Sequence, residues 1–156
     1  MITHKPPGRT IPPQFSKFRL RIGRSPMHGE GVFAAETIAA GRKVIEYAGE
    51  RSTWEEDARR ARARRRRGEP RNVYRAYIGR LCVIDGTVGG TGAEFINHSC
   101  EPNLGGRVIR ERLLLFSLRK IRRGEELSWD YRLSNRGPRV KCRCGSSKCR
   151  GTMNVK

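Results

Sequence analysis

The stretch KCRCGSSKCRG at residues 141–151 contains Cys142, Cys144 and Cys149 within eight residues, in the spacing C-x-C-x4-C. Such a density of thiols is typical of a metal site, because cysteine thiolates are preferred ligands of structural zinc. Four basic side chains in the same stretch favour thiolates, since nearby cations lower thiol pKa values. A structural zinc site has four ligands, so another part of the chain must supply the fourth.

The fourth ligand must be one of the two remaining cysteines, Cys82 or Cys100. Cys82 lies in the apolar run 81–84, where a cysteine acts as a small buried hydrophobic side chain. Cys100 lies in the polar stretch 94–103, which reads EFINHSCEPN, and is free to turn outward. We predict one zinc ion bound by Cys100, Cys142, Cys144 and Cys149, with unligated reduced thiols as the alternative.

The chain is strongly basic, with 34 lysines and arginines against 15 acidic residues in 156, a formal net charge of +19 at pH 7. Its length suits one folded domain, and its 27 arginines suit the recognition of phosphate and carboxylate groups. We expect an acidic partner, with nucleic acid as the first candidate; the alternative is that the high arginine content reflects genome bias or solubility.

The sequence has no apolar run of about 18 residues, so we expect no membrane span. Residues 1–8 lack the apolar stretch of a secretory signal, and five cysteines are an odd number for a disulfide framework. We therefore expect a cytoplasmic protein with reduced or metal-bound thiols, and leave open its association with a nucleoid or chromatin and its delivery to another cell.

Short apolar runs separated by glycine, asparagine and proline predict a mostly β fold. Residues 1–17 contain four prolines and are expected to form an extended N-terminal arm. Strands are expected at residues 18–22, 43–47, 81–84, 107–109, 113–118 and 127–129.

One helix is expected after Ser52, because Ser52 and Glu55 have the spacing of a capping box and Gly68 supplies a stop. Its apolar stripe is thin and consists of Trp54, Ala58 and Ala61. Residues 55–67 hold seven arginines, so most of the helix must face water or an anionic partner.

Three further segments offer functional side chains. Residues 28–31 read HGEG, where glycine would let the backbone approach a ligand, although a plain hairpin turn has the same pattern. Asn97 and His98 provide hydrogen-bond donors and acceptors beside Cys100. Residues 129–131 hold Trp, Asp and Tyr in a row, and by themselves could equally be the end of a strand.

Together, in this order, these segments resemble the SET-domain family of protein-lysine methyltransferases with a zinc-binding post-SET tail. The resemblance covers roughly residues 18–154 and rests on motifs at residues 28–31, 44–50, 83–87, 95–103, 118–127 and 130–131, on Tyr74 and on the C-terminal cysteines. It implies several small β-sheets, a threaded C-terminal segment and an Arg-rich insert helix. The implied domains are an N-terminal arm (1–17), a SET domain (18–133), a linker (134–140) and a zinc-binding post-SET tail (141–156).

The resemblance also implies roles for single residues. S-adenosylmethionine is expected at His28, Gly29, Glu30 and Gly31, with Tyr74, Asn97 and His98 also on the cofactor. Tyr131 corresponds to the family's catalytic tyrosine, and Tyr74 to a second tyrosine of the active-site pocket. Trp129 falls in the substrate channel where the family more often has phenylalanine or tyrosine, which leaves the number of methyl groups added open. Asp130 is expected to be structural.

The expected function is transfer of a methyl group from S-adenosylmethionine to the ε-amine of a lysine in a protein substrate. A basic enzyme repels a lysine-rich peptide at long range. Either the peptide channel is locally acidic through Glu50, Glu94 or Glu101, or the protein modifies basic proteins already bound to nucleic acid. The alternative function is a catalytically inactive, basic, zinc-stabilised nucleic-acid-binding module on the same scaffold.

Overall fold

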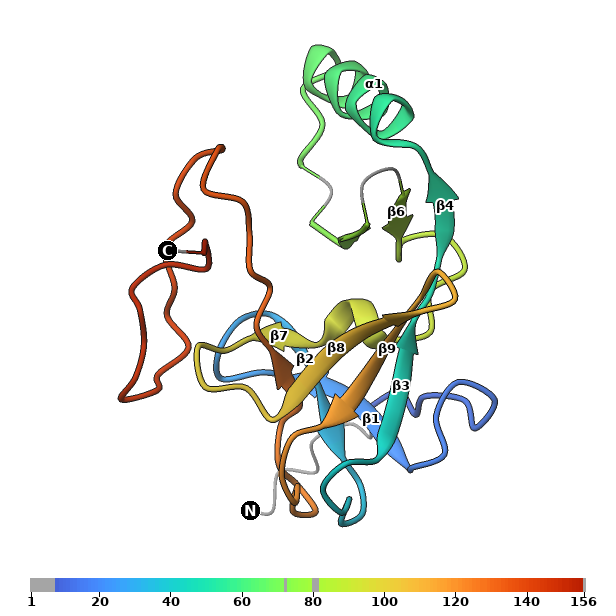
Figure 1. Cartoon of the computed structure of the whole chain (residues 1–156), viewed down its shortest axis with the longest axis vertical. Helices are drawn as coiled ribbons and strands as arrows, with labels where there is room; N and C mark the ends of the chain where they lie inside the picture. The colour runs from blue at the N-terminus through green and yellow to red at the C-terminus, as the bar shows by residue number, and fades with distance from the viewer. Residues whose placement is uncertain (1–7, 72, 80–81, 156) are drawn as a thin grey trace, which may run out of the picture.

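The computed structural model describes residues 8–71, 73–79 and 82–155 and is built mainly from short strands in small sheets (Figure 1). The strands are β1 (Leu20–Arg24), β2 (Glu30–Ala34), β3 (Lys43–Tyr47), β4 (Glu50–Ser52), β5 (Arg75–Ile78), β6 (Cys82–Asp85), β7 (Asn97–His98), β8 (Leu104–Ile109), β9 (Arg112–Ser117) and β10 (Ser128–Trp129). The helices are α1 (Trp54–Arg66) and the 3-10 helix η1 (Ala93–Phe95). The expected mostly β fold is confirmed. Expectations that concern residues 1–7, Leu81 and Lys156 lie outside the described residues.

The largest sheet has the strand order β3-β9-β8-β10-β7. Val44, Ile45 and Leu115 from its antiparallel part are at most 1% exposed and fill the core. β10 pairs in parallel with both β7 and β8, which are consecutive in the chain. The connection at residues 99–103 therefore crosses β10, which is the threaded arrangement that the resemblance implies.

β1 and β2 form an antiparallel hairpin that carries the HGEG stretch at its turn. Leu20 and Ile22 are 0% and 7% exposed, whereas Arg21 and Gly23 on the opposite face are only partly buried, as the alternation of a half-buried strand requires. Gly29 in the turn has a φ of +50°, a conformation that glycine adopts without steric cost.

The third sheet, β4-β6-β5, carries α1 at one end of the long axis of the molecule (Figure 1). The helix begins one residue later than expected, because Ser52 pairs with Val83 as part of β4. Thr53 is the N-cap instead, and its hydroxyl accepts a hydrogen bond from the backbone N–H of Glu56 at 3.2 Å. Within the part of the chain that the structure describes, no helix is long and apolar enough to cross a membrane.

The apolar stripe expected on α1 is not what fixes the helix to the protein. Trp54 is 45% exposed and contacts Tyr77 edge-on, with ring centroids 5.6 Å apart. Asp57 is the buried residue of the helix, and its carboxylate accepts hydrogen bonds from Arg75 at 2.7 Å and from the Tyr77 hydroxyl at 3.1 Å. A buried ion pair therefore fixes α1, and the arginines stay outside.

Sequence periodicity missed four strands, namely β2, β4, β5 and β7. They are between two and five residues long; β4 and β7 consist of polar residues, and β2 and β5 hold no more than three apolar residues each. Other strands supply their hydrogen-bond partners, so a short local pattern cannot reveal them.

The described part of the N-terminal arm, residues 8–17, lies against the core. Ile11 is 3% exposed, and its backbone N–H donates to the carbonyl of Leu20 at 3.0 Å. At the other end of the chain, the Asn154 side chain donates to the carbonyl of Ser134 at 2.7 Å and so connects the tail to the 134–140 segment.

Candidate active site and metal centre

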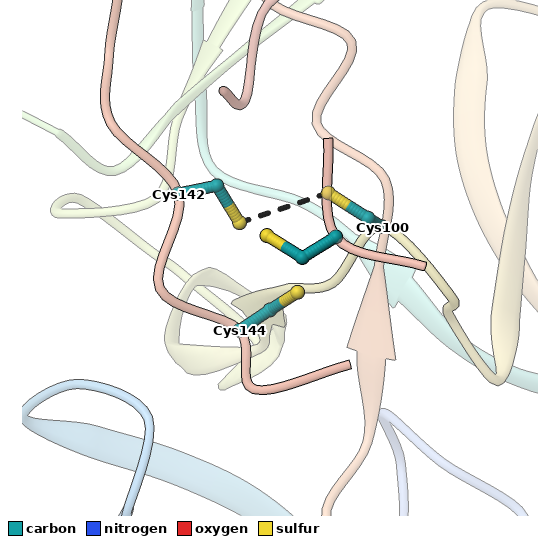
Figure 2. Close-up of side chains that lie close together, drawn as sticks. Cys100, Cys142 and Cys144 are labelled. Carbon is teal, nitrogen blue, oxygen red and sulfur yellow. Dashed lines mark hydrogen bonds between the residues drawn. The ribbon is translucent and has the colours of Figure 1, made fainter. Parts of the chain in front are cut away.

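The tail brings three cysteines to the loop after β7, where Cys100 lies. Figure 2 shows the side chains of Cys100, Cys142 and Cys144 pointing toward one another. The sulfur atoms of these three residues and Cys149 all lie within 4.8 Å of one another, and those of Cys100 and Cys142 are 3.7 Å apart. Four thiolates in a tetrahedron around zinc, at about 2.3 Å each, would be about 3.8 Å apart. The spacing and the donor set therefore fit structural zinc, while Cys82 lies half-buried against the core, outside this group.

The cysteine cluster offers an anionic ligand near neutral pH. Burial raises the pKa of the Cys142 thiol to about 12. Burial acts in the same direction on Cys144, but backbone hydrogen bonds from Cys100 and Ser146 outweigh it and lower the pKa of Cys144 to about 6. A thiolate at Cys144 is the form that binds a metal ion.

His98 connects the cysteine cluster to the candidate catalytic tyrosine. Its buried Nδ1 accepts a hydrogen bond from the backbone N–H of Tyr131 at 3.1 Å, so Nε2 carries the hydrogen of the neutral ring. Nε2 lies 3.4 Å from the sulfur of Cys100 and donates toward it. Burial lowers the pKa of His98, which keeps the ring neutral at pH 7. Both ring nitrogens of His98 have hydrogen-bond partners within the protein. A ligand beside His98 would therefore contact its backbone and not its ring nitrogens.

Asn97 joins the HGEG turn to the parallel strands. Its Nδ2 lies within hydrogen-bond distance of the carbonyls of His28 (3.1 Å) and Glu30 (2.9 Å) and of Oε1 of Glu126 (2.9 Å). The hydroxyl of Ser25 donates to the other Glu126 oxygen at 2.9 Å. The structure thus brings the predicted cofactor turn and Asn97 into one hydrogen-bonded network.

Gly31 is the position of this turn where a larger residue would force the Glu126 side chain to move. A Cβ added there would lie 2.2 Å from Oε1 of Glu126 and 3.0 Å from the Cβ of Ser25. Gly29 therefore makes the turn, and Gly31 lets the Glu126 carboxylate approach the backbone. Sequence reasoning missed Glu126, because a glutamate before a short strand has no distinctive pattern.

Tyr131 follows β10, and its hydroxyl donates to the carbonyl of Ile96 at 2.9 Å. Burial, with smaller contributions from Tyr74 and Glu126, raises the pKa of Tyr131, so the phenol stays protonated at neutral pH. Tyr74 is 36% exposed, and its ring lies 5.6 Å from that of Phe95. Tyr74 is near enough to contribute to the raised pKa of Tyr131.

An aromatic cluster surrounds Tyr131. The ring of Trp129 lies 5.6 Å from that of Tyr131 and 6.1 Å from that of Tyr47. The indole packs over Gly106, where an added Cβ would be 3.4 Å from Cζ3. Tyr47 is a site residue that the sequence analysis missed; burial and the charge of Glu94 raise its pKa, so it also stays neutral. The cluster forms an aromatic wall of low polarity beside the Tyr131 hydroxyl.

Asp130 fixes the tail beside this cluster. Its carboxylate accepts two hydrogen bonds from the guanidinium of Arg150, both 2.8 Å long. Burial opposes ionisation, but Arg150 outweighs it and lowers the pKa of Asp130. The carboxylate is therefore ionised and engaged in a bidentate ion pair, which holds the tail next to β10.

The fold and the site define a β-rich domain in which a cysteine cluster is coupled to a tyrosine-centred pocket, and the sequence matches the SET domain over residues 29–132. The "Histone-lysine N-methyltransferase trithorax" of Drosophila virilis is 40% identical over 139 residues, covering 85% of this chain and 4% of that protein. For "Histone-lysine N-methyltransferase set-2" of Caenorhabditis elegans, the identity is 36% over 147 residues, covering 90% of this chain and 10% of that protein. For "Histone-lysine N-methyltransferase 2B" of Homo sapiens, the identity is 37% over 147 residues, covering 89% of this chain and 5% of that protein. The chain therefore belongs to the SET-domain family, and it spans between 4% and 10% of the length of these relatives.

Proposed function

We propose that this protein is a protein-lysine N-methyltransferase. S-adenosylmethionine, when bound, supplies the methyl group, and the acceptor is the ε-amine of a lysine in a protein substrate. The observation that carries the proposal is the position of Tyr131, which lies in an aromatic cluster and is connected through His98 to the cysteine cluster. The names of the relatives, all histone-lysine N-methyltransferases, support the same reaction.

We assign the cofactor contacts to the turn His28–Gly31, Tyr74, Asn97 and the backbone of His98. Support comes from Asn97, whose side chain connects this turn to β7. The absence of a Cβ at Gly31 leaves room for the Glu126 carboxylate behind the turn. The turn is thus held in one conformation before a ligand arrives, which lowers the cost of binding.

The acceptor amine must lose its proton before it can react. With a reference pKa of about 10.4, a neutral lysine amine at pH 7 costs about 4.6 kcal/mol. The aromatic rings of Tyr47, Trp129 and Tyr131 disfavour the charged form, because an apolar environment lowers the pKa of an amine. Tyr131 keeps its own proton, and Asp130 is engaged by Arg150, so neither acts as the general base.

We assign Tyr131 to aligning the reacting groups and Tyr74 and Trp129 to lining the substrate channel. Alignment of reacting groups alone accelerates a reaction substantially. Zinc bound by Cys100, Cys142, Cys144 and Cys149 would hold the tail against the loop after β7. The ion pair between Asp130 and Arg150 supports the same placement of the tail.

The substrate that we propose is a basic protein associated with nucleic acid or chromatin. An acidic peptide channel is less suited to the structure, because Glu50 forms an ion pair with Arg60 at 2.6 Å and Glu101 one with Lys148 at 2.7 Å. Docking on the nucleic acid that carries the substrate would overcome the repulsion between two basic proteins.

The test is transfer of labelled methyl from S-adenosylmethionine to a panel of DNA-binding and ribosomal proteins, with mass spectrometry to locate methyl-lysine. Tyr131→Phe should lose transfer while its unfolding free energy falls by about 1 kcal/mol, the worth of one hydrogen bond. Tyr77→Phe is the matched control: it also loses one phenol hydrogen bond, to Asp57, but outside the site, and should keep transfer. Equal transfer by the wild type and Tyr131→Phe would refute the role of Tyr131.

The inactive nucleic-acid-binding module is the less favoured function. Asn97, His98 and Tyr131 belong to one connected network with the HGEG turn, and a scaffold without turnover has no need of that network. Absence of both methyl transfer and S-adenosylmethionine binding in the zinc-loaded protein would favour the module instead.

A further inference from the structure

The arginines of α1 divide into two sets that face different surroundings. On one side, Arg60 forms ion pairs with Glu50 at 2.6 Å and with Glu56 at 2.8 Å. Arg64 and Arg67 pair with Glu69 just beyond the helix. Each of these arginines is therefore paired with a carboxylate of the same chain, and Arg64 and Arg67 share that of Glu69.

The other set consists of Arg62, Arg65 and Arg66, all of which are exposed. Within the described residues, none of the ion pairs made by this helix includes them. Residues three and four positions apart lie side by side on a helix, so these three arginines form one face, the outer arginine face. Arg59 borders it and is paired with Glu56.

The outer arginine face has the chemistry of a phosphate-binding surface. Its neighbours toward the helix N-terminus are Glu55, Ala58 and Arg59, so it contains no large apolar side chain. Stable protein interfaces are centred on buried aromatic or aliphatic residues, and single-stranded nucleic acid is bound on aromatic platforms. A nucleic-acid duplex can be bound without a buried apolar centre and without an aromatic platform, because arginines can contact the phosphates of its backbone.

The length of the outer arginine face agrees with the spacing of phosphates on a nucleic-acid duplex. Arg62 to Arg66 spans about 6 Å along the helix axis, at about 1.5 Å per residue. Phosphates on one strand of a duplex advance by about 3.4 Å along its axis, so the face covers about two successive steps. α1 stands at one end of the molecule, where a long partner can reach it (Figure 1).

We propose that the outer arginine face of α1, formed by Arg62, Arg65 and Arg66, binds the phosphate backbone of a nucleic-acid duplex without reading its sequence. The face deepens the proposed function by giving the site through which a substrate-bearing duplex would dock. It does not depend on methyl transfer, because duplex binding is measured with neither cofactor nor lysine substrate present.

The experiment measures binding of the zinc-loaded full chain to a fluorescent duplex of mixed sequence between about 0.05 and 0.2 M salt. Each phosphate contact contributes a slope of about −0.9 to the dependence of log affinity on log salt. The triple variant R62A/R65A/R66A should reduce that slope by about 2.7 and weaken binding roughly 100- to 500-fold at 0.1 M salt. Alanine has the highest helix propensity, so α1 should remain formed.

The matched control is K120A/R122A/R123A, which removes the same charge from exposed residues of the loop after β9, at the opposite end of the molecule (Figure 1). At 0.1 M salt, charges beyond about 10 Å are largely screened, so the control should bind nearly as the wild type does. If the alanine variant melts at a lower temperature, R62Q/R65Q/R66Q removes the same charges with another good helix former.

Equal weakening by both triple variants would overturn the proposal, since diffuse charge would then explain binding. Undetectable duplex binding by the wild type at 0.05 M salt would overturn it as well. Tighter binding of single strands, or competition by poly-glutamate as effective as competition by unlabelled duplex, would assign the face to a different partner and refute a duplex site.

Discussion

Replacing Asn97 by aspartate should destabilise the protein more than truncating it to alanine, although aspartate is nearly isosteric with asparagine. The two hydrogens of Nδ2 are shared among the carbonyls of His28 and Glu30 and the carboxylate of Glu126. Asn97→Ala loses one neutral and one charge-assisted hydrogen bond at a half-buried site, which together cost about 2 to 3 kcal/mol. Asn97→Asp loses the same bonds and also directs a carboxylate at three oxygens.

The extra cost of Asn97→Asp comes from the charge of Glu126. Two unit charges about 4 Å apart repel by about 4 kcal/mol at an effective dielectric constant of about 20. Rotation and water would relieve part of this repulsion, so we expect Asn97→Asp to be about 2 kcal/mol less stable than Asn97→Ala at pH 8. Folding raises the pKa of the introduced carboxyl above that of a free aspartate. The penalty is therefore constant above the raised pKa, decreases between the raised pKa and that of a free aspartate, and is gone below the latter.

Urea denaturation at pH 8, 6 and 4, followed by tryptophan fluorescence, measures the difference between the two variants. A penalty of about 2 kcal/mol corresponds to a pKa raised by about 1.5 units, so the difference should change little between pH 8 and 6 and be mostly lost by pH 4, where a protonated carboxyl can donate a hydrogen bond to Glu126. Asn135→Asp, at an exposed position, is the control for the change in net charge and should be nearly as stable as the wild type. A difference that is independent of pH, or an Asn97→Asp variant as stable as Asn97→Ala at pH 8, would refute this account of the network.

Three further predictions concern the metal, the helix and the turn. The purified protein should contain about one zinc ion, and Cys149→Ser should lose both the metal and methyl transfer; metal analysis showing full zinc in the variant would contradict the cluster. Asp57→Ala should cost about 2 to 4 kcal/mol in urea denaturation, because it removes the carboxylate of Asp57 from the partly buried Arg75; a loss below about 1 kcal/mol would mean that packing fixes α1. Gly31→Ala should abolish S-adenosylmethionine binding in calorimetry, since its Cβ displaces Glu126; unchanged affinity would remove the turn from the cofactor site.

The sequence predicted best those features that local patterns encode. The C-x-C-x4-C spacing and the contrast between Cys82 in an apolar run and Cys100 in a polar one identified the four cysteines that the structure brings together. Strands β3 and β9 were predicted because their apolar runs fill the core. In both cases the deciding information lies within a few residues.

Features that depend on distant partners could not be predicted in this way. The one-residue error at the start of α1 arose because Ser52 pairs with Val83, and no local signal distinguishes Ser52 from Thr53 as a cap. The importance of Glu126 and Tyr47 depends on contacts with residues far along the chain. Family resemblance implied the roles of Asn97 and Tyr131, but it did not indicate which atoms they contact.

The candidate active site is complete only when the two-residue ladder between β7 and β10 has formed, so a functional site indicates complete folding. The ladder pairs Asn97 with Ser128 and His98 with Trp129, so it can form only after a long loop has closed, whereas the β8–β9 hairpin is local. A shift of one residue would turn the Asn97 amide away from the HGEG turn and His98 away from Cys100. A preparation with native secondary structure by circular dichroism can therefore contain molecules whose ladder is out of register. The stoichiometry of cofactor binding, in sites per chain, would count the molecules in which the last strand has threaded correctly.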